Sequence, residues 1–456
     1  MNRVFTLILV LVLALWSCHP REDGFEQIHA PFLQANTAWA DSMLLEMTLD
    51  EKIGQLLILQ SRQYFPTDSL AHWVWTGNMG GYMPEGISLI DYVHLKDSLQ
   101  SIARIPLMMG TAQTIALNNQ FSDAPHYPLP ITLSAIPSRK KKTAILEQYV
   151  QQCKTLDIHF SLHPYMHRAD TTDTPYDIYA LENDPEELLF QSYVAMRTLQ
   201  DEKVLSIAGP FRELYFADPE DKEAQSRRDS LLRPYYSLSQ SGLSGILIDN
   251  ALFSQDTNRF YPYGFLRDYL RKHASFDALL FAKLDTNVTA LDLLHAGADL
   301  LLIQDSPSHI LQQIRKLVKD GFLSVEQINT KVRKVLLAKD WLDIDQKPFG
   351  KSCTDDAFAL FDKEKHRFPI YDLYASSTTL ANNMDSLIPF QDLAQHSFRL
   401  LHFGNASMRP FQKTFAKYAY SRIALKHYDL SEKEPSDKLP SGKNWKNKTL
   451  VITLAN

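Results

Sequence analysis

The amino-acid sequence predicts an α/β fold in which a (β/α)8 barrel of the TIM type is followed by an incomplete second α/β domain. Eight short apolar runs, most of them separated by segments of helical spacing, are found in a chain of 456 residues. Several of these runs are apolar at every position, which is typical of strands buried on both faces of a parallel sheet. An open doubly wound sheet is the rival fold, and the number of runs favours the closed barrel.

The predicted barrel spans residues 39–341 and begins at Met47–Leu59, where a capped helical turn leads into the first strand. The next seven strands are expected at Gly80–Met83, Ile105–Met109, Ile158–His163, Val204–Ala208, Gly245–Ile248, Ala278–Lys283 and Leu300–Ile303. Helical spacing is found at Leu89–Ile102, Lys142–Lys154, Pro185–Leu199, Leu231–Ser241, Tyr263–Lys272 and Ser308–Lys319. A closing helix is expected over Ser324–Asp340, where basic residues near its end suit the negative end of the helix dipole.

The chain beyond the barrel has two predicted parts. Residues 342–374 mix Asp, Lys, Pro and aromatic side chains, a composition that favours a linker. Residues 375–456 are expected to begin a second α/β domain, with elements at Ser397–Phe403 (strand), Met408–Tyr418 (helix), near Arg422–Lys426 (a possible short strand) and Thr449–Leu454 (strand). So few elements bury little apolar surface. We therefore expect this piece to dock on the barrel, or else to be the start of a truncated domain.

The amino-terminal residues 1–17 have the pattern of a targeting segment. Arg3 precedes Val4–Trp16, an apolar run of 13 residues that is too short to span a bilayer as a helix. The run leads to Ser17-Cys18, which resembles a bacterial lipoprotein signal, and this resemblance implies lipidation of Cys18. The alternative is an ordinary secretory signal. Residues 18–38 are polar and are predicted to be a surface tether. From the signal pattern we expect an exported protein that is anchored by lipid at the bacterial cell envelope, facing the periplasm or in the outer membrane.

Composition and spacing argue against several classes of partner. The chain has 47 Lys and Arg against 53 Asp and Glu, a formal charge of -6, which speaks against nucleic acid. Besides Cys18 it holds two cysteines, too few for a disulfide framework or a metal cluster. His159, His163 and His167 are spaced by four, but over a predicted strand and loop they read as core or rim histidines. No metal and no cofactor are predicted.

Three stretches of the sequence match motifs of a known family. Met47–Leu59 is similar to "M(S/T)LEEKIGQL", Ala296–Ile303 to "AGADLLL(M/I)", and Asp320–Lys339 to the family's closing helix. On these motifs the chain resembles glycoside hydrolase family 3, in particular its bacterial β-N-acetylglucosaminidase branch, over about residues 40–341. The carboxy-terminal piece resembles the start of the family's second domain. The resemblance implies a TIM-type barrel and an enzyme that hydrolyses O-glycosyl bonds.

The catalytic motifs of that family are substituted in this chain. Aligning Phe276-Asp277 with the strand-7 motif that carries the family's carboxylate nucleophile puts Lys283 at the nucleophile position. A lysine ammonium cannot attack an anomeric carbon as a carboxylate does, and its charge opposes an oxocarbenium-like centre. The family's acid motif after strand 5, "KH-F-P-G-H-G-D", has its Lys and first His at Gly209 and Pro210. No histidine occurs between His167 and His273, so a local shift of the alignment does not supply one.

The sugar-contacting positions of the family give the candidate binding residues. The motif "D-Q-E-G-G" aligns with Ala112 and Gln113, so the acid is lost and the glutamine is kept. The histidine of "M-x-x-H" falls on Asn250, and "P-x-x-D" aligns with Pro164 to His167. The predicted binding residues are therefore Gln113, His163, His167, Asn250 and Lys283.

Two acids near predicted strand ends are candidate substitutes for the lost catalytic pair. Asp249 follows the sixth strand and Asp285 follows the seventh, at the end of the barrel where such enzymes place their active sites. A hydrolase needs two carboxyl groups at a defined separation, and a new pair could form there. The alternative is that one of these acids pairs with Lys283 and neutralises its charge.

The sequence therefore predicts an envelope protein of the β-N-acetylhexosaminidase type that has lost its catalytic set. Its expected role is to bind a glycan or amino sugar, or to act as a scaffold for a partner hydrolase. One alternative is an active β-N-acetylglucosaminidase-like hydrolase that uses the substitute acids. Another is a surface interaction module without affinity for sugar.

Overall fold

The structure is a computed structural model that describes the residues 28–34, 36–61, 65–112, 117, 120–166, 182, 184–211, 232–248, 270–272, 275–286, 288–344, 358–386, 388–391, 393, 396–403, 407, 409–418, 425–428 and 449–454. The chain divides at Thr378 into two compact units. The predicted signal segment 1–17, Cys18 and most of the predicted tether lie outside the described residues. No described helix is both long enough and apolar enough to cross a membrane.

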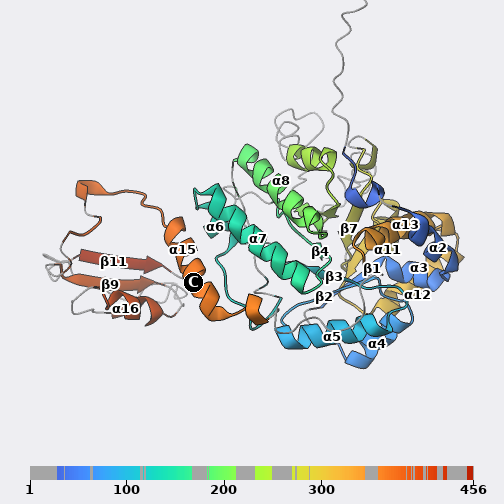
Figure 1. Cartoon of the computed structure of the whole chain (residues 1–456), viewed down its shortest axis with the longest axis horizontal. Helices are drawn as coiled ribbons and strands as arrows, with labels where there is room; N and C mark the ends of the chain where they lie inside the picture. Colours follow the sequence, from blue (N-terminus) through green and yellow to red (C-terminus); the bar gives the residue numbers. More distant parts are fainter. Residues whose placement is uncertain are drawn as a thin grey trace, which may run out of the picture. The chain divides into compact units, whose positions relative to one another are not determined.

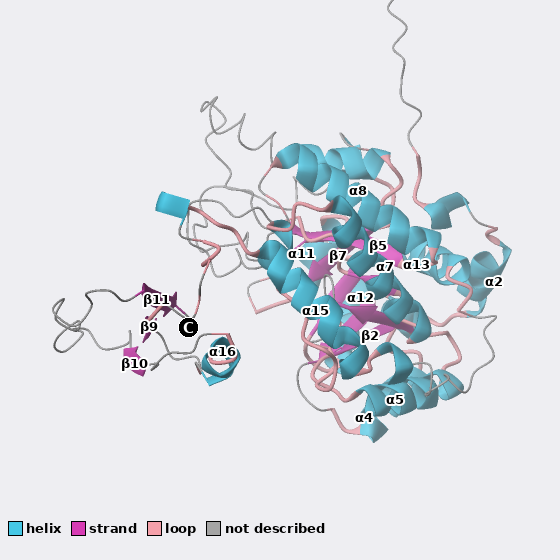
Figure 2. Ribbon diagram, turned by 60° about the vertical axis from the view of Figure 1, so that its left-hand side comes forward, coloured by secondary structure: helices cyan, strands magenta, loops and turns pink. Residues whose placement is uncertain are grey.

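Eight parallel strands form a closed barrel in the first unit, so the predicted fold class is confirmed and the open sheet is excluded. The strands follow one another around the barrel in chain order, and β1 closes it by pairing with β8, where Leu57 lies opposite Leu301. Figure 2 shows these strands surrounded by helices. Their bounds are β1 Leu57–Ser61, β2 Gly81–Pro84, β3 Met108–Thr111, β4 Phe160–Ser161, β5 Leu205–Phe211, β6 Gly245–Ile248, β7 Leu279–Lys283 and β8 Leu300–Ile303.

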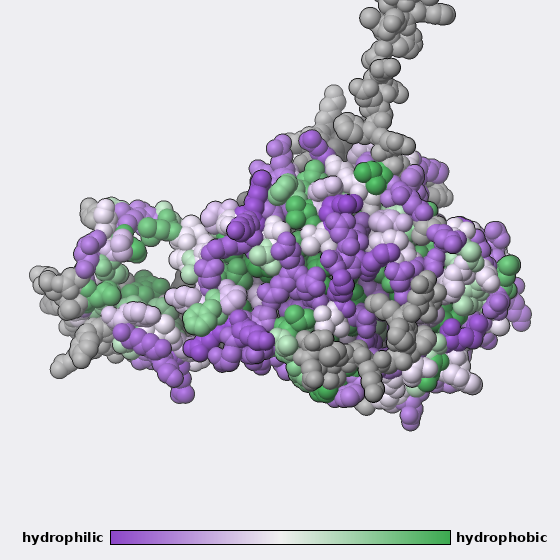
Figure 3. Space-filling view, in the orientation of Figure 1, coloured by the Kyte–Doolittle hydropathy of each residue, from purple (hydrophilic) through white to green (hydrophobic). Residues whose placement is uncertain are grey.

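The helices of the first unit begin at residues that the sequence marks as caps. Thr48 and Glu51 form a reciprocal capping box at one helix start, and Ser324 and Gln327 form another. Figure 3 shows a mainly hydrophilic outer surface over these helices, with small hydrophobic areas. The labelled elements are η1 Pro31–Gln34, α2 Ala38–Glu46, α3 Leu49–Gln55, α4 Thr67–Trp75, α5 Leu89–Ile102, α6 Pro130–Ser134, α7 Arg139–Thr155, α8 Pro185–Asp201, α11 Ala290–His295, α12 Pro307–Lys319, α13 Val325–Trp341 and α15 Lys363–Ser377.

The barrel interior is filled by side chains, and two aromatic rings show which face of the strands points inward. The rings of Phe160 on β4 and Phe281 on β7 lie 5.5 Å apart between centroids. Because β4 and β7 are not neighbours in the sheet, this contact passes through the inside of the barrel. A Cβ added at Gly110 on β3 would come within 2.0 Å of the Phe160 ring, so glycine makes room for that ring.

The helix α15, Lys363–Ser377, begins within the range that the sequence predicted as a linker, residues 342–374, and ends three residues beyond it. Its His366 and Leu373 are buried, and the Nδ1 of His366 lies 2.7 Å from the hydroxyl of Tyr127. The sequence did not predict this helix because Pro369 lies inside it and only a narrow stripe of its residues is apolar. In the same way η1, at the end of the predicted tether, buries Phe32 in the core of the barrel.

The second unit contains a small parallel sheet, with strands in the order β10-β9-β11. The strands β9 and β11 lie at the positions that the sequence predicts. The elements of the unit are η5 Met384–Ser386, β9 Phe398–Phe403, α16 Arg409–Phe415, β10 Leu425–Tyr428 and β11 Thr449–Leu454. Phe398 is buried and contacts Phe390 and Phe415 edge to face. This aromatic cluster supplies a core of the unit's own.

Candidate functional site at the carboxyl ends of the barrel strands

Lys283 is the last residue of β7 and lies at the mouth of the barrel, at the carboxyl ends of the strands. Successive side chains of a strand alternate between its two faces, so Lys283 shares the inward face with Phe281, one pleat nearer the mouth. In the ladder to β8 it is paired with Leu302, and it is partly exposed. The structure therefore places an amine where active sites of TIM-type barrels lie.

Asp285 follows at the same rim. The backbone N–H of Leu284 donates to the carbonyl of Leu302 at 2.9 Å, which carries the ladder one residue past β7. Asp285 comes directly after this bond and is partly exposed. The predicted site residues Gln113, His167, Asp249 and Asn250 lie outside the described residues. Within the described ranges no group of three or more His, Cys, Asp or Glu could hold a metal ion.

Gly209 on β5 is the residue at which we expected the lysine of the family's acid motif, and its backbone excludes a side chain. Its φ is +147°, a conformation that residues with a Cβ rarely adopt. A Cβ at this position would lie 2.7 Å from the carbonyl oxygen of Leu247 on β6. The next residue, Pro210, has no group that can donate a proton. With this course of the chain, neither Gly209 nor Pro210 offers a side-chain proton donor.

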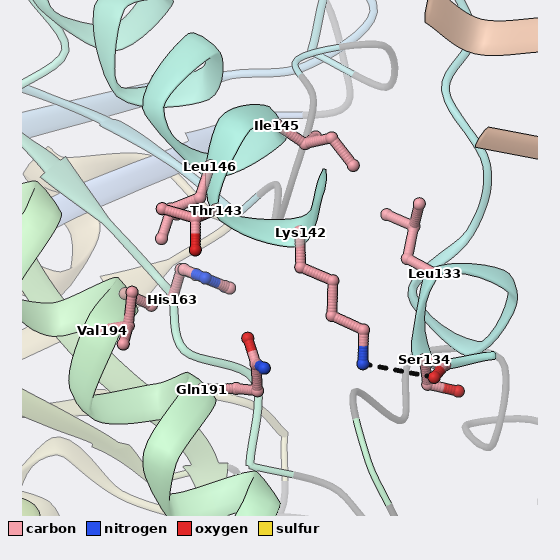
Figure 4. Close-up of a pocket in the computed structure, with 10 residues that line it drawn as sticks. Leu133, Ser134, Lys142, Thr143, Ile145, Leu146, His163, Gln191 and Val194 are labelled. Carbon is pink, nitrogen blue, oxygen red and sulfur yellow. Dashed lines mark hydrogen bonds between the residues drawn. The ribbon is translucent and has the colours of Figure 1, made fainter. Parts of the chain in front are cut away.

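His163 faces the helix layer and not the barrel mouth, which separates it from the predicted binding residue Lys283. Ser161, two residues earlier, contacts the hydroxyl of Tyr149 on α7 at 2.7 Å, and strand alternation puts His163 on the same side. In Figure 4 its ring lies between Thr143 and Leu146 on α7 and Val194 on α8. The sequence could not show this, because the facing of a residue just past a two-residue strand depends on its neighbours in space.

The His163 ring is buried beside a cavity of about 50 Å³ and is held in its neutral form. Burial lowers the pKa of His163 to about 3, because the charged imidazolium cannot be solvated there. Among the residues that the structure describes, none is a hydrogen-bond partner of its Nδ1 atom, although the ring packs edge to face against Tyr149 at 6.2 Å between centroids. A buried polar atom in this state costs stability.

We expect His163→Phe to make the protein more resistant to acid. The unfolded chain binds a proton at this histidine near pH 6.5 and the folded chain does not, so the wild type loses up to about 1.4 kcal/mol of stability per pH unit below pH 6. Phenylalanine removes this loss and the unpaired nitrogen. Urea unfolding at several values between pH 7.5 and pH 4.5 measures the effect. The prediction would be contradicted if the unfolding free energies of the variant and the wild type fell in parallel as the pH is lowered.

The comparisons with known proteins agree with this geometry. A closed eight-stranded barrel with its polar rim at the carboxyl ends of the strands defines a TIM-type barrel protein. Residues 48–338 match the model of the glycosyl hydrolase family 3 N terminal domain, which is more than half of the chain. The chain therefore belongs to glycosyl hydrolase family 3, as its motifs predict. No curated protein sequence matches the chain.

Solved structures with the same architecture include a β-glucoside phosphorylase, an exo-1,3/1,4-β-glucanase and a β-glucosidase. A β-glucoside phosphorylase, BglX, bound to 2FGlc is 16% identical, with a TM-score of 0.76 over 93% of this chain and 83% of that chain. A mutant of the exo-1,3/1,4-β-glucanase ExoP from a Pseudoalteromonas species is 15% identical, with a TM-score of 0.72 over 94% and 83%. A β-glucosidase from Listeria innocua in complex with glucose is 16% identical, with a TM-score of 0.68 over 92% and 64%. At these identities the likeness shows the fold alone.

Proposed function

We propose that this chain is a catalytically impaired member of glycosyl hydrolase family 3, of the β-N-acetylhexosaminidase type, that binds a glycan at the mouth of its barrel. The observation that carries the proposal is Lys283 on the inward face of β7, at the aligned position of the family's nucleophile. Retaining and inverting hydrolysis both need a pair of carboxyl groups around the scissile bond. An ammonium group in place of one of them repels the positive charge that develops on the sugar ring.

Three further observations support the proposal. Gly209 and Pro210 stand where the family's acid motif begins, and neither supplies a proton donor. Two similar structures hold 2FGlc and glucose, which supports a sugar ligand for this fold. An amine such as Lys283 donates hydrogen bonds to hydroxyl and carbonyl oxygens, so it suits glycan binding without cleavage.

The test is turnover of 4-nitrophenyl N-acetyl-β-D-glucosaminide and 4-nitrophenyl β-D-glucoside by the purified protein. We expect no hydrolysis above the buffer rate, whereas glycosidases accelerate such reactions by at least about 10⁶-fold. Lys283→Asp is expected to stay inactive as well, because it restores one carboxylate and no acid. Isothermal titration of chitotetraose should show binding to the wild type that is at least fivefold weaker in Lys283→Ala. Substantial turnover by the wild type would refute the impaired site.

One observation favours the alternative of an active hydrolase with substitute acids: Asp285 lies at the same rim as Lys283. If this alternative holds, the wild type cleaves the aryl glycosides and Asp285→Asn or Asp249→Asn abolishes the activity. The exposed Asp305, just past β8, provides the control, because Asp305→Asn should then leave the turnover unchanged. Absence of both turnover and glycan affinity would instead favour an interaction module.

A further inference from the structure

A second cavity, of about 750 Å³, lies between α4 and α5, which run side by side on the outside of β2 (Figure 1). We call it the α4–α5 crevice, and its apolar floor is made by Leu70 on α4, Tyr82 on β2 and Leu95 on α5. Its volume is within the range of small-molecule binding sites. Tyr82 is 4% exposed, so the floor is firmly packed.

The crevice opens on the outer side of the barrel wall, and Glu85 connects it to the barrel interior. Ser61 and Tyr82 line the crevice and therefore face the helices, so Gln60 between Leu59 and Ser61 faces the interior. The Nε2 of Gln60 donates to Oε1 of Glu85 at 2.7 Å, and Glu85 also lines the crevice. Glu85 therefore marks the boundary between the two sites.

The walls of the crevice carry acceptors and hydroxyl groups. Asp91, His94 and Ser98 follow one another along α5 and are exposed. The Ser88 hydroxyl, at the start of α5, donates to Oδ2 of Asp91 at 2.5 Å, which orients this carboxylate. Among the described lining residues there are two carboxylates and one histidine, and neither Lys nor Arg. This charge balance disfavours an anionic ligand and suits one rich in hydroxyl donors.

An aromatic ring stands at the edge of the crevice. Phe65 lines it and is partly buried, and Trp73 holds the Phe65 ring edge to face at 5.6 Å between centroids and an interplanar angle of 73°. A fixed ring next to carboxylates and hydroxyls matches a ligand with one apolar and one polar side. Pyranose rings have this character, because their C–H groups and their hydroxyl groups lie on different faces and edges.

We propose that the α4–α5 crevice binds a segment of a neutral glycan, with Phe65 as the apolar platform and Glu85 and Asp91 as acceptors of its hydroxyl groups. The crevice is a site of its own, and it does not need the barrel mouth to bind sugar. Where both sites bind, their common boundary at Glu85 lets one chain extend from the mouth into the crevice.

The test fills the crevice with a large side chain. Ser98→Trp places an indole at a lining position, and Ser101→Trp places one at an exposed position one turn further along α5 that does not line the crevice. Both changes are made in the full chain carrying Lys283→Met, which weakens the contribution of the mouth. Isothermal titration with chitotetraose and cellotetraose measures the remaining affinity. We expect Ser98→Trp to lower it at least tenfold and Ser101→Trp to change it by less than twofold, with both variants melting as the parent does.

Three outcomes would overturn the proposal. The first is that neither tetrasaccharide binds once Lys283 is replaced. This result would agree with glycan binding at the mouth and would refute glycan binding in the crevice. The second is equal affinity in Ser98→Trp and Ser101→Trp. The third is selective binding of the cationic glucosamine tetramer that is lost in Asp91→Asn, which would show a site for cations. Because Lys283→Ala alone tests the mouth, failure of the two proposals can be told apart.

Discussion

Replacing Asp299 with alanine is expected to lower the free energy of unfolding by about 3–5 kcal/mol, because it removes a buried carboxylate and leaves two partly buried cations without this counter-ion. Asp299 lies just before β8 and is 2% exposed. It pairs with Arg271, and its Oδ1 lies 3.3 Å from the Nζ of Lys334. The backbone N–H of Leu280 on β7 donates to its Oδ2 at 3.0 Å. The carboxylate thus links three segments at the amino end of the barrel.

The charge state of this carboxylate follows from the same contacts. Burial by itself disfavours the ionised form, but the cations Arg271 and Lys334 outweigh it and hold the pKa of Asp299 below its usual value. The stability it contributes is therefore present above the unfolded pKa of about 3.9 and is lost only as the pH falls through the lower folded pKa.

Urea unfolding at pH 7, followed by far-ultraviolet circular dichroism, measures the effect of Asp299→Ala. Asp277→Ala is the matched control, since Asp277 is in an exposed pair with His29 whose side chains are 42% and 51% exposed. Such a pair contributes about 0–1 kcal/mol. A loss in Asp299→Ala no greater than in this control would contradict the expected role of the cluster.

Lys339→Met is expected to remove a rise in stability that the wild type shows in alkaline solution. Lys339 on α13 is 0% exposed, and its Nζ donates to Oε1 of Gln55 at 2.5 Å and to the carbonyl of Pro106. Burial lowers the pKa of Lys339 to about 7. Between about pH 7 and pH 10 the unfolded chain holds this proton and the folded chain does not, so stability rises by up to about 1.4 kcal/mol per pH unit.

The measurement is the slope of the unfolding free energy against pH from 7 to 10. Lys319→Met provides the control, because Lys319 is exposed at the end of α12 and should leave the slope of the wild type unchanged. The difference between the two variants isolates the buried amine from all other groups that titrate in this range. Equal slopes in both variants would mean that Lys339 keeps its proton in the fold.

The barrel was predictable because its strands are buried on both faces. A strand such as β8, Leu300–Ile303, is apolar at every position, and few other structures give that pattern. Prediction was weaker at the edges of elements: the third strand was expected at Ile105–Met109 and the ladder runs over Met108–Thr111. Burial of Leu107 explains the shift, because a residue that is apolar and buried need not take part in the ladder.

The functional site was predictable in part. The alignment put Lys283 at the end of the seventh strand, and the structure has it there. His163 was predicted among the same binding residues, yet it packs between α7 and α8. No sequence motif indicates the α4–α5 crevice, because its residues come from two helices and a strand that are separate in the chain. Its polar residues are also of types that are common on any protein surface.

By itself the sequence determined the fold class and the family, because both depend on residue types and on spacing along the chain. The tertiary structure alone decided which way each side chain faces. It turned Lys283 inward with Phe281, turned His163 toward the helices, and gave Gly209 a backbone that excludes a side chain. The direction in which a side chain points depends on closure of the barrel and on the helices packed against it. Both arise from contacts between residues that are far apart in the chain.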